Sequence, residues 1–202
     1  MTRLVPSLLA VTLFSIPAPA PARAQTSVPA KDYTPADVAF MSGMIYHHAQ
    51  ALLMASWAPT HGASADVKTL CERIIRGQQD EIVILAQWLA ERNEPVPHVE
   101  PEHTAHDMGG HMMPGMLNAE QLAQLDRARG EQFDELFLRF MIQHHEGAIT
   151  MVNELFGRGA GEENPVYKIA SGVFADQTTE IERMQRMLAD KMFGPLPATN
   201  PR

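Results

Sequence analysis

Apolar residues recur every three or four positions through most of the chain, which is the spacing of amphipathic helices. The first run begins at Thr34, a capping residue that precedes Pro35, and the last run ends at Gly194. The pattern predicts long helices over residues 34–57, 64–92, 131–156 and 165–193, and a short helix over 118–129. No run alternates between apolar and polar residues as a strand would, so we expect an all-α fold.

Two of the predicted helices repeat one another. Residues 37–54 and 134–151 are identical at eight of 18 positions, with a constant offset of 97. The shared residues are Asp37, Phe40, Met44, Ile45, His47, His48, Ala51 and Met54 in the first copy and Asp134, Phe137, Met141, Ile142, His144, His145, Ala148 and Met151 in the second. In the helices that follow, the matching residues are Gln78, Glu81 and Ile82 with Gln177, Glu180 and Ile181. Each copy is therefore a helical hairpin, and two hairpins that bury their apolar faces together predict a four-helix bundle.

The repeat also sets the domain organisation. We expect one bundle domain over residues 32–193, made of repeat one (34–93), a connecting loop (95–117) and repeat two (131–193). A single domain of this length is large enough to bury a substantial core.

The first 24 residues have the features of a secretory signal peptide. Arg3 supplies a positive start, an apolar run too short to span a bilayer extends to Ile16, and residues 22–24 form a small-x-small cleavage signal. The sequence therefore predicts cleavage after Ala24 and a periplasmic or secreted protein, with no membrane insertion once the peptide is removed.

Charge and cysteine content narrow the classes of function. The 202-residue chain carries 24 acidic and 16 basic residues, and its net charge of −8 disfavours nucleic acid and anionic membranes as partners. Cys71 is the one cysteine, which excludes an intramolecular disulfide and argues against a closed structural zinc site. Its helical context favours a small buried hydrophobic residue over a reactive thiol.

The repeated helices gather histidine and methionine on one face. At about 100 degrees per residue, the residues Met41, Met44, His47, His48, Ala51 and Met54 fall within an arc of about 140 degrees. Imidazole with thioether suits Cu(I), and imidazole also suits Cu(II). A methionine stripe alone is more often core packing, and a single buried histidine is more often structural. Repetition of both features in the two halves favours a metal site.

The loop at 95–117 holds a third cluster of the same residue types. Its members are His98, His103, His106, Met108, His111, Met112, Met113 and Met116. A loop of this length between packed helices is either functional or disordered. Its composition indicates metal binding, with a merely polar linker as the alternative.

These residues resemble the domain of unknown function 305 family, which includes periplasmic copper-binding proteins of the CopM type. The resemblance rests on FMSGMIYHHAQALLMA and FLRFMIQHHEGAITMV, each followed by a Gln-x-x-Glu-Ile segment, and it covers about residues 32–191. It implies a ferritin-like bundle that binds copper, with silver, Ag(I), as a further candidate. The implied ligands are Met44, His47, His48, Met54, Met141, His144, His145 and Met151. Met184 and Met187 are further candidates, although their counterparts Leu85 and Trp88 have no thioether.

We therefore expect an exported copper-binding protein, not an enzyme, that sequesters copper or passes it to a copper pump or oxidase. A di-metal oxidase on the same scaffold is one alternative. It would recruit Glu81 and Glu180, but no histidine lies three residues after either. A metal-free interaction bundle with structural histidines is the other alternative, and it predicts no change in melting temperature with copper.

Overall fold

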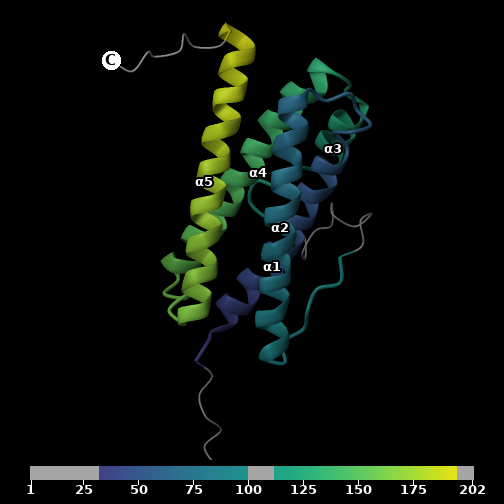
Figure 1. The fold of residues 1–202 in the computed structure, drawn as a ribbon. Helices are drawn as coiled ribbons and strands as arrows, with labels where there is room; N and C mark the ends of the chain where they lie inside the picture. Colours follow the sequence, from purple (N-terminus) through teal and green to yellow (C-terminus); the bar gives the residue numbers. More distant parts are fainter. Residues whose placement is uncertain (1–31, 100–111, 195–202) are drawn as a thin grey trace, which may run out of the picture. The chain divides into compact units, whose positions relative to one another are not determined.

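The helices lie close to where the hydrophobic pattern predicts them. The structure is a computed structural model that describes residues 32–99 and 112–194, and these residues form five helices and no strand. The helices are α1 (Pro35–Ser56), α2 (Ala65–Glu91), α3 (Ala119–Arg127), α4 (Glu131–Gly157) and α5 (Asn164–Phe193) (Figure 1). The all-α prediction is confirmed. The fourth long helix begins one residue earlier than predicted, at Asn164, because Glu163 is its N-cap. The predicted signal peptide lies outside the described residues.

Capping side chains determine where three of the helices begin. The Thr34 hydroxyl accepts a hydrogen bond from the Asp37 backbone N–H at 3.2 Å, and the Asp37 carboxylate accepts one from the Thr34 N–H at 2.7 Å. Asn118 and Gln121 form the same reciprocal cap at the start of α3, whereas at α2 the Ser64 hydroxyl alone accepts from the Val67 N–H. Each cap satisfies backbone donors that would otherwise have no partner at the helix start.

The four long helices form two hairpins. Helix α1 packs along α2 and α4 packs along α5, and the hairpins meet mainly through α1 and α4 (Figure 1). Helices α2 and α5 approach one another over a shorter stretch. None of the described helices has a continuous apolar stretch that could cross a bilayer.

The repeated aspartates join the two hairpins. The Asp37 carboxylate at the start of α1 accepts a hydrogen bond from the Gly161 N–H, in the α4–α5 turn, at 2.7 Å. The Asp134 carboxylate at the start of α4 accepts one from the Ser64 N–H, in the α1–α2 turn, at 3.1 Å, and also binds Lys191 Nζ at 2.8 Å. Both aspartates are only 1% exposed. Each hairpin therefore holds the turn of the other through the same residue of the repeat.

The buried apolar side chains fall into two clusters. The first contains Met54, Met141 and Met184 with residues of α1, α2, α3, α4 and α5, and Met187 packs at its edge. The second contains Met41 and Met44, and Met151 packs at its edge. The four imidazoles of the repeat lie between the clusters along α1 and α4, because each pair precedes Met54 or Met151 and follows Met44 or Met141 on its helix.

Two small residues of α2, Cys71 and Gly77, have different surroundings. Cys71 is 2% exposed within the first cluster, as its helical context indicates. Gly77 does not mark a close helix contact, because a Cβ there would meet no described atom within 4 Å.

Candidate metal centre

The two histidine pairs meet in the centre of the bundle. His47 and His48 of α1 and His144 and His145 of α4 are all 0% exposed. The rings of His47 and His144 are in contact across the hairpin interface, with centroids 3.9 Å apart and planes inclined by 39°. Each ring lies 6.5 Å or 6.1 Å, centroid to centroid, from its neighbour in sequence. We refer to these four residues as the histidine layer.

Glutamates of the outer helices hold two rings of the histidine layer. His48 Nε2 lies 2.6 Å from Glu81 Oε2, and His145 Nε2 lies 2.6 Å from Glu180 Oε2. The second contact has hydrogen-bond geometry, whereas the first has the distance without the alignment. In the sequence, no histidine lies three residues after Glu81 or Glu180. Each glutamate instead contacts a histidine of the neighbouring helix.

Apart from His47 Nε2, the remaining ring nitrogens of the layer are buried, and they have no hydrogen-bond partner in the described part of the chain. His47 Nε2 lies 3.0 Å from the Pro114 carbonyl oxygen, which can only accept, so Nε2 carries the proton and Nδ1 keeps its lone pair. Nδ1 of all four histidines, and Nε2 of His144, are buried with no hydrogen-bond partner among the described residues. Metal-binding histidines commonly donate one ring N–H to a carboxylate or carbonyl and coordinate through the other nitrogen.

Burial keeps the central pair of rings neutral. Desolvation, with added repulsion from His48, lowers the pKa of His47 from 6.5 to about 3. Desolvation, followed by repulsion from His47, holds the pKa of His144 well below 6.5. Both imidazoles are therefore in the uncharged form that coordinates metals at neutral pH.

Methionine side chains flank the layer on both sides, but they do not converge on it as one set. Met54 and Met141 share the first apolar cluster with Met184, and Met44 and Met151 belong to the second. Thioethers are thus available above and below the imidazoles, in two separate groups. Within residues 32–99 and 112–194, no three His, Cys, Asp or Glu side chains are grouped to hold one ion.

The end of the connecting loop packs directly against the layer. Besides the Pro114 contact to His47, the Gln50 side chain donates to the Leu117 carbonyl at 3.0 Å and accepts from the Leu117 N–H at 2.7 Å. On the opposite helix, Gly147 gives the segment room, because a Cβ there would lie 2.0 Å from the Pro114 oxygen. Gln50 and Gly147 are equivalent positions of the repeat, and their difference lets one loop segment pass between the helices.

Three loop methionines are described. Met116 is 4% exposed, whereas Met112 is 52% exposed. Met113 and Met151 both lie close to Gly43 of α1. A Cβ added at Gly43 would lie 3.4 Å from Met113 Sδ and 3.3 Å from Met151 Cε. Met113 and Met151 also line a cavity of about 220 Å³ together with Pro114. Of the other loop candidates, His98 is exposed, and His103, His106, Met108 and His111 lie outside the described residues.

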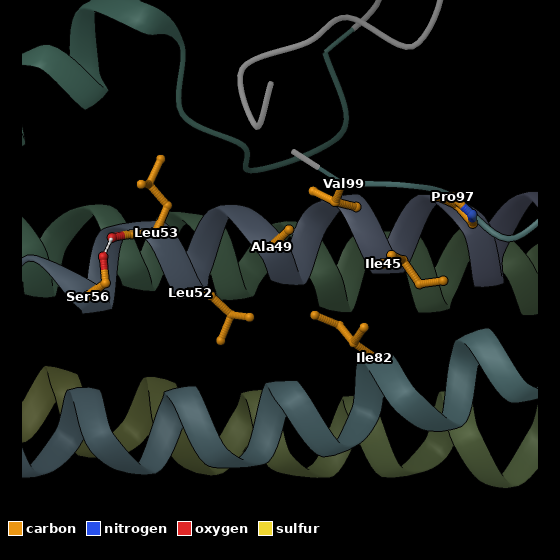
Figure 2. A pocket seen from close by; sticks show the side chains of 8 residues that line it. All are labelled: Ile45, Ala49, Leu52, Leu53, Ser56, Ile82, Pro97 and Val99. Atoms are coloured by element: carbon orange, nitrogen blue, oxygen red, sulfur yellow. Dashed lines mark hydrogen bonds between the residues drawn. The ribbon is translucent and has the colours of Figure 1, made fainter. Parts of the chain in front are cut away.

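A cavity on the other side of α1 has no comparable chemistry. It measures about 480 Å³ and its lining is apolar except for Ser56 (Figure 2). The Ser56 hydroxyl donates to the Leu53 carbonyl at 2.7 Å, and Leu52 and Ile82 face one another between α1 and α2 (Figure 2). No metal ligand from the histidine layer lines this space.

Another buried histidine, which the motif analysis did not single out, is structural. His61 is 5% exposed, and its Nε2 lies 2.8 Å from the Asp126 carbonyl and 3.1 Å from the Asp126 carboxylate. Its own carbonyl accepts from the Gly130 N–H at 2.8 Å. It fastens α3 to the α1–α2 turn and is not part of the layer.

The fold and the buried layer define a helical bundle with an internal repeat and a central histidine–methionine site. Residues 37–188 match the family described as "Domain of unknown function (DUF305)", and the chain belongs to this family. No curated protein matches the sequence.

Solved structures show the same fold. A DUF305 fragment from Deinococcus radiodurans is 29% identical with a TM-score of 0.66, and the match covers 78% of this chain and 97% of that one. CopM in its Cu(II)-bound form is 28% identical with a TM-score of 0.63, covering 77% and 97%. CopM is also known in Cu(I)-bound and Ag-bound forms. A dodecameric thioferritin from Bacteroides fragilis, 15% identical with a TM-score of 0.57 over 77% of this chain and 86% of that one, shares the fold alone. The prediction of a ferritin-like all-α fold is thereby confirmed.

Proposed function

We propose that this protein binds copper in the histidine layer and sequesters it or hands it over, as a binder and not an enzyme. The observation that carries the proposal is the contact between His47 and His144, whose centroids lie 3.9 Å apart. Both rings are wholly buried and neutral, and both have a nitrogen with no partner in the described part of the chain. A core histidine with a purely structural role would normally have its nitrogens satisfied.

The flanking thioethers favour copper over other metals. Methionine sulfur is a soft, uncharged ligand, and with neutral imidazole it suits Cu(I) and Ag(I). Calcium and magnesium would require oxygen ligands, which the apolar clusters on either side of the layer do not supply. His47 and His144 would hold copper together with thioethers of one of the two groups, either Met54 with Met141 or Met44 with Met151. His48 and His145 would be oriented by their glutamates. Imidazole ligands also allow Cu(II) to bind.

The similarity to CopM supports this proposal. CopM is known with Cu(I), Cu(II) and Ag bound, and it is similar to this chain over most of both lengths. The signal-peptide pattern of residues 1–24 supports a periplasmic or secreted location. There the protein would contribute to copper resistance, with a copper pump or oxidase as the exchange partner.

The test is anaerobic Cu(I) titration of residues 25–202 against a competing chelator. We expect the double variant His47→Ala/His144→Ala to lose at least about 100-fold in affinity, because it removes the two central nitrogen ligands. The matched control is His61→Gln, which alters a buried histidine outside the layer and should leave the affinity unchanged.

A loop variant separates the two candidate sites. Replacement of His103, His106 and His111 by Asn and of Met108 by Leu leaves residues 112–117 in place and should change the affinity less than tenfold. If this variant loses tight binding while His47→Ala/His144→Ala keeps it, the proposal for the bundle is refuted. Far-UV circular dichroism of each variant establishes that the helices are retained.

A further inference from the structure

A polar cavity lies between α2 and α5, beside the two glutamates that contact the histidine layer. It measures about 210 Å³ and is lined by Gln78 and Glu81 of α2 and by Asp176, Gln177 and Glu180 of α5. Both repeats contribute to it, because Gln78 and Glu81 are equivalent to Gln177 and Glu180. No methionine lines this cavity.

Two buried glutamine side chains of the cavity have amide atoms with no hydrogen-bond partner among the described residues. Gln78 is 3% exposed and Gln177 is 1% exposed. Both side-chain atoms of Gln78 and the Oε1 atom of Gln177 make no hydrogen bond to any described residue. A buried amide without a partner is costly, and such groups in a native protein commonly face a bound ion or ordered water. Because the two glutamines occupy the same repeat position in the same cavity, they mark a place for a ligand.

The charge of the cavity selects a cation. Three carboxylates, those of Glu81, Asp176 and Glu180, line it against one basic residue, Arg73. Partial burial, followed by repulsion from Glu81 and Glu180, raises the pKa of Asp176. Repulsion between carboxylates that share a space is relieved by a cation placed among them.

The ligand atoms determine the class of cation. Carboxylate and amide oxygens suit hard or borderline divalent ions such as Mn²⁺, and they do not suit Cu(I). Glu81 and Glu180 line the cavity, and the Oε2 atom of each also lies 2.6 Å from a histidine Nε2. The three carboxylates line one cavity, but the described residues include no three His, Cys, Asp or Glu side chains placed to hold an ion by themselves. Amide oxygens and water would therefore complete the coordination.

We propose that Glu81, Glu180, Asp176, Gln78 and Gln177 form a divalent-cation site, separate from the copper site in the histidine layer. The pairs His48–Glu81 and His145–Glu180 connect the two sites, since each glutamate both contacts an imidazole and lines the cavity. A cation in the cavity would therefore influence how the His48 and His145 rings are oriented. The site does not depend on copper binding.

The test is titration of the copper-free protein with Mn²⁺, followed by the loss of the electron paramagnetic resonance signal of free Mn²⁺. We expect Glu81→Gln/Glu180→Gln to weaken Mn²⁺ binding at least tenfold, because glutamine keeps an oxygen near each imidazole but removes both charges. Glu182→Gln is the matched control on α5, since Glu182 is exposed and pairs with Arg186 outside the cavity. It should bind Mn²⁺ as the wild type does.

Two further double variants separate the roles of the amides and of the histidine layer in Mn²⁺ binding. Gln78→Leu/Gln177→Leu removes the unpartnered amides without removing charge, and it should also weaken Mn²⁺ binding. His47→Ala/His144→Ala alters only the histidine layer and should retain Mn²⁺ binding even where Cu(I) binding is lost. Failure of the wild type to bind Mn²⁺ at millimolar concentration, or equal binding by the Glu81→Gln/Glu180→Gln variant, overturns the proposal.

Discussion

Replacement of Gly147 by alanine tests how the loop is held against the histidine layer. The added Cβ would lie 2.0 Å from the Pro114 oxygen and 2.4 Å from the Pro114 carbonyl carbon. These are backbone atoms, which cannot rotate away as a side-chain end could. The segment of residues 113–117 must therefore move away from α4.

The expected loss in the free energy of unfolding follows from the contacts that residues 113–117 make. Displacement of this segment breaks the His47–Pro114 contact and the hydrogen bond that Gln143 Nε2 donates to the Gly115 carbonyl, at 3.0 and 3.2 Å. Two hydrogen bonds contribute about 1–3 kcal/mol together. Partial exposure of Leu117, which is 0% exposed, costs about 1–2 kcal/mol more. Alanine gains about 1 kcal/mol over glycine inside a helix, so we expect a net loss of about 1–4 kcal/mol.

The assay is urea unfolding followed by circular dichroism, with Gly77→Ala as the matched control. Gly77 also lies inside a helix, but a Cβ there meets no described atom within 4 Å. The same substitution should therefore stabilise the protein by about 0.5–1 kcal/mol at Gly77. Equal effects at the two positions would refute the packing of the loop segment against α4.

Three further predictions concern stability and pH. Asp37→Ala or Asp134→Ala should each lower the free energy of unfolding by about 2–4 kcal/mol in urea melts, because each leaves a turn N–H of the other hairpin without its acceptor; an effect below about 0.5 kcal/mol would contradict the cross-link. Since the pKa of His47 falls from 6.5 to about 3, the unfolded chain takes up a proton that the folded chain does not. The free energy of unfolding of the metal-free protein should drop by about 1.4 kcal/mol per pH unit below pH 6.5 for this residue, and His47→Gln should show a shallower slope. Burial raises the pKa of Cys71 from 9.0 to about 12, so its stabilising contribution falls as pH rises above 9.0. Iodoacetamide should label it in the native protein much more slowly than in urea, and equal rates would contradict its burial.

The helices and the repeat could be predicted because their signals are local. Periodicity and capping residues such as Thr34 and Asn118 lie within one turn of the boundaries that they determine. The identity of Asp37 and Asp134 marked them as equivalent. Their hydrogen bonds to the turn of the other hairpin join residues 124 and 70 positions apart, and no local pattern reports such a contact.

The site was predicted less completely. The helical face of the histidines and methionines was correct, but a helical wheel omits the distance along the axis. Met44 and Met54 are ten residues apart, about 15 Å along the helix, and they therefore enter different apolar clusters. The difference between Gln50 and Gly147 is visible when the two repeats are aligned. Its cause, the passage of residues 114–117 between the two helices, is visible only in the structure.

The most direct test of the copper proposal is X-ray absorption at the copper edge of the Cu(I)-loaded protein. We expect a first shell of imidazole nitrogen and thioether sulfur together. The sulfur contribution should fall in a variant with leucine in place of Met44, Met54, Met141 and Met151, and the nitrogen contribution should fall in His47→Ala/His144→Ala. A first shell of oxygen and nitrogen alone, or one that is unchanged in both variants, would contradict copper binding in the histidine layer.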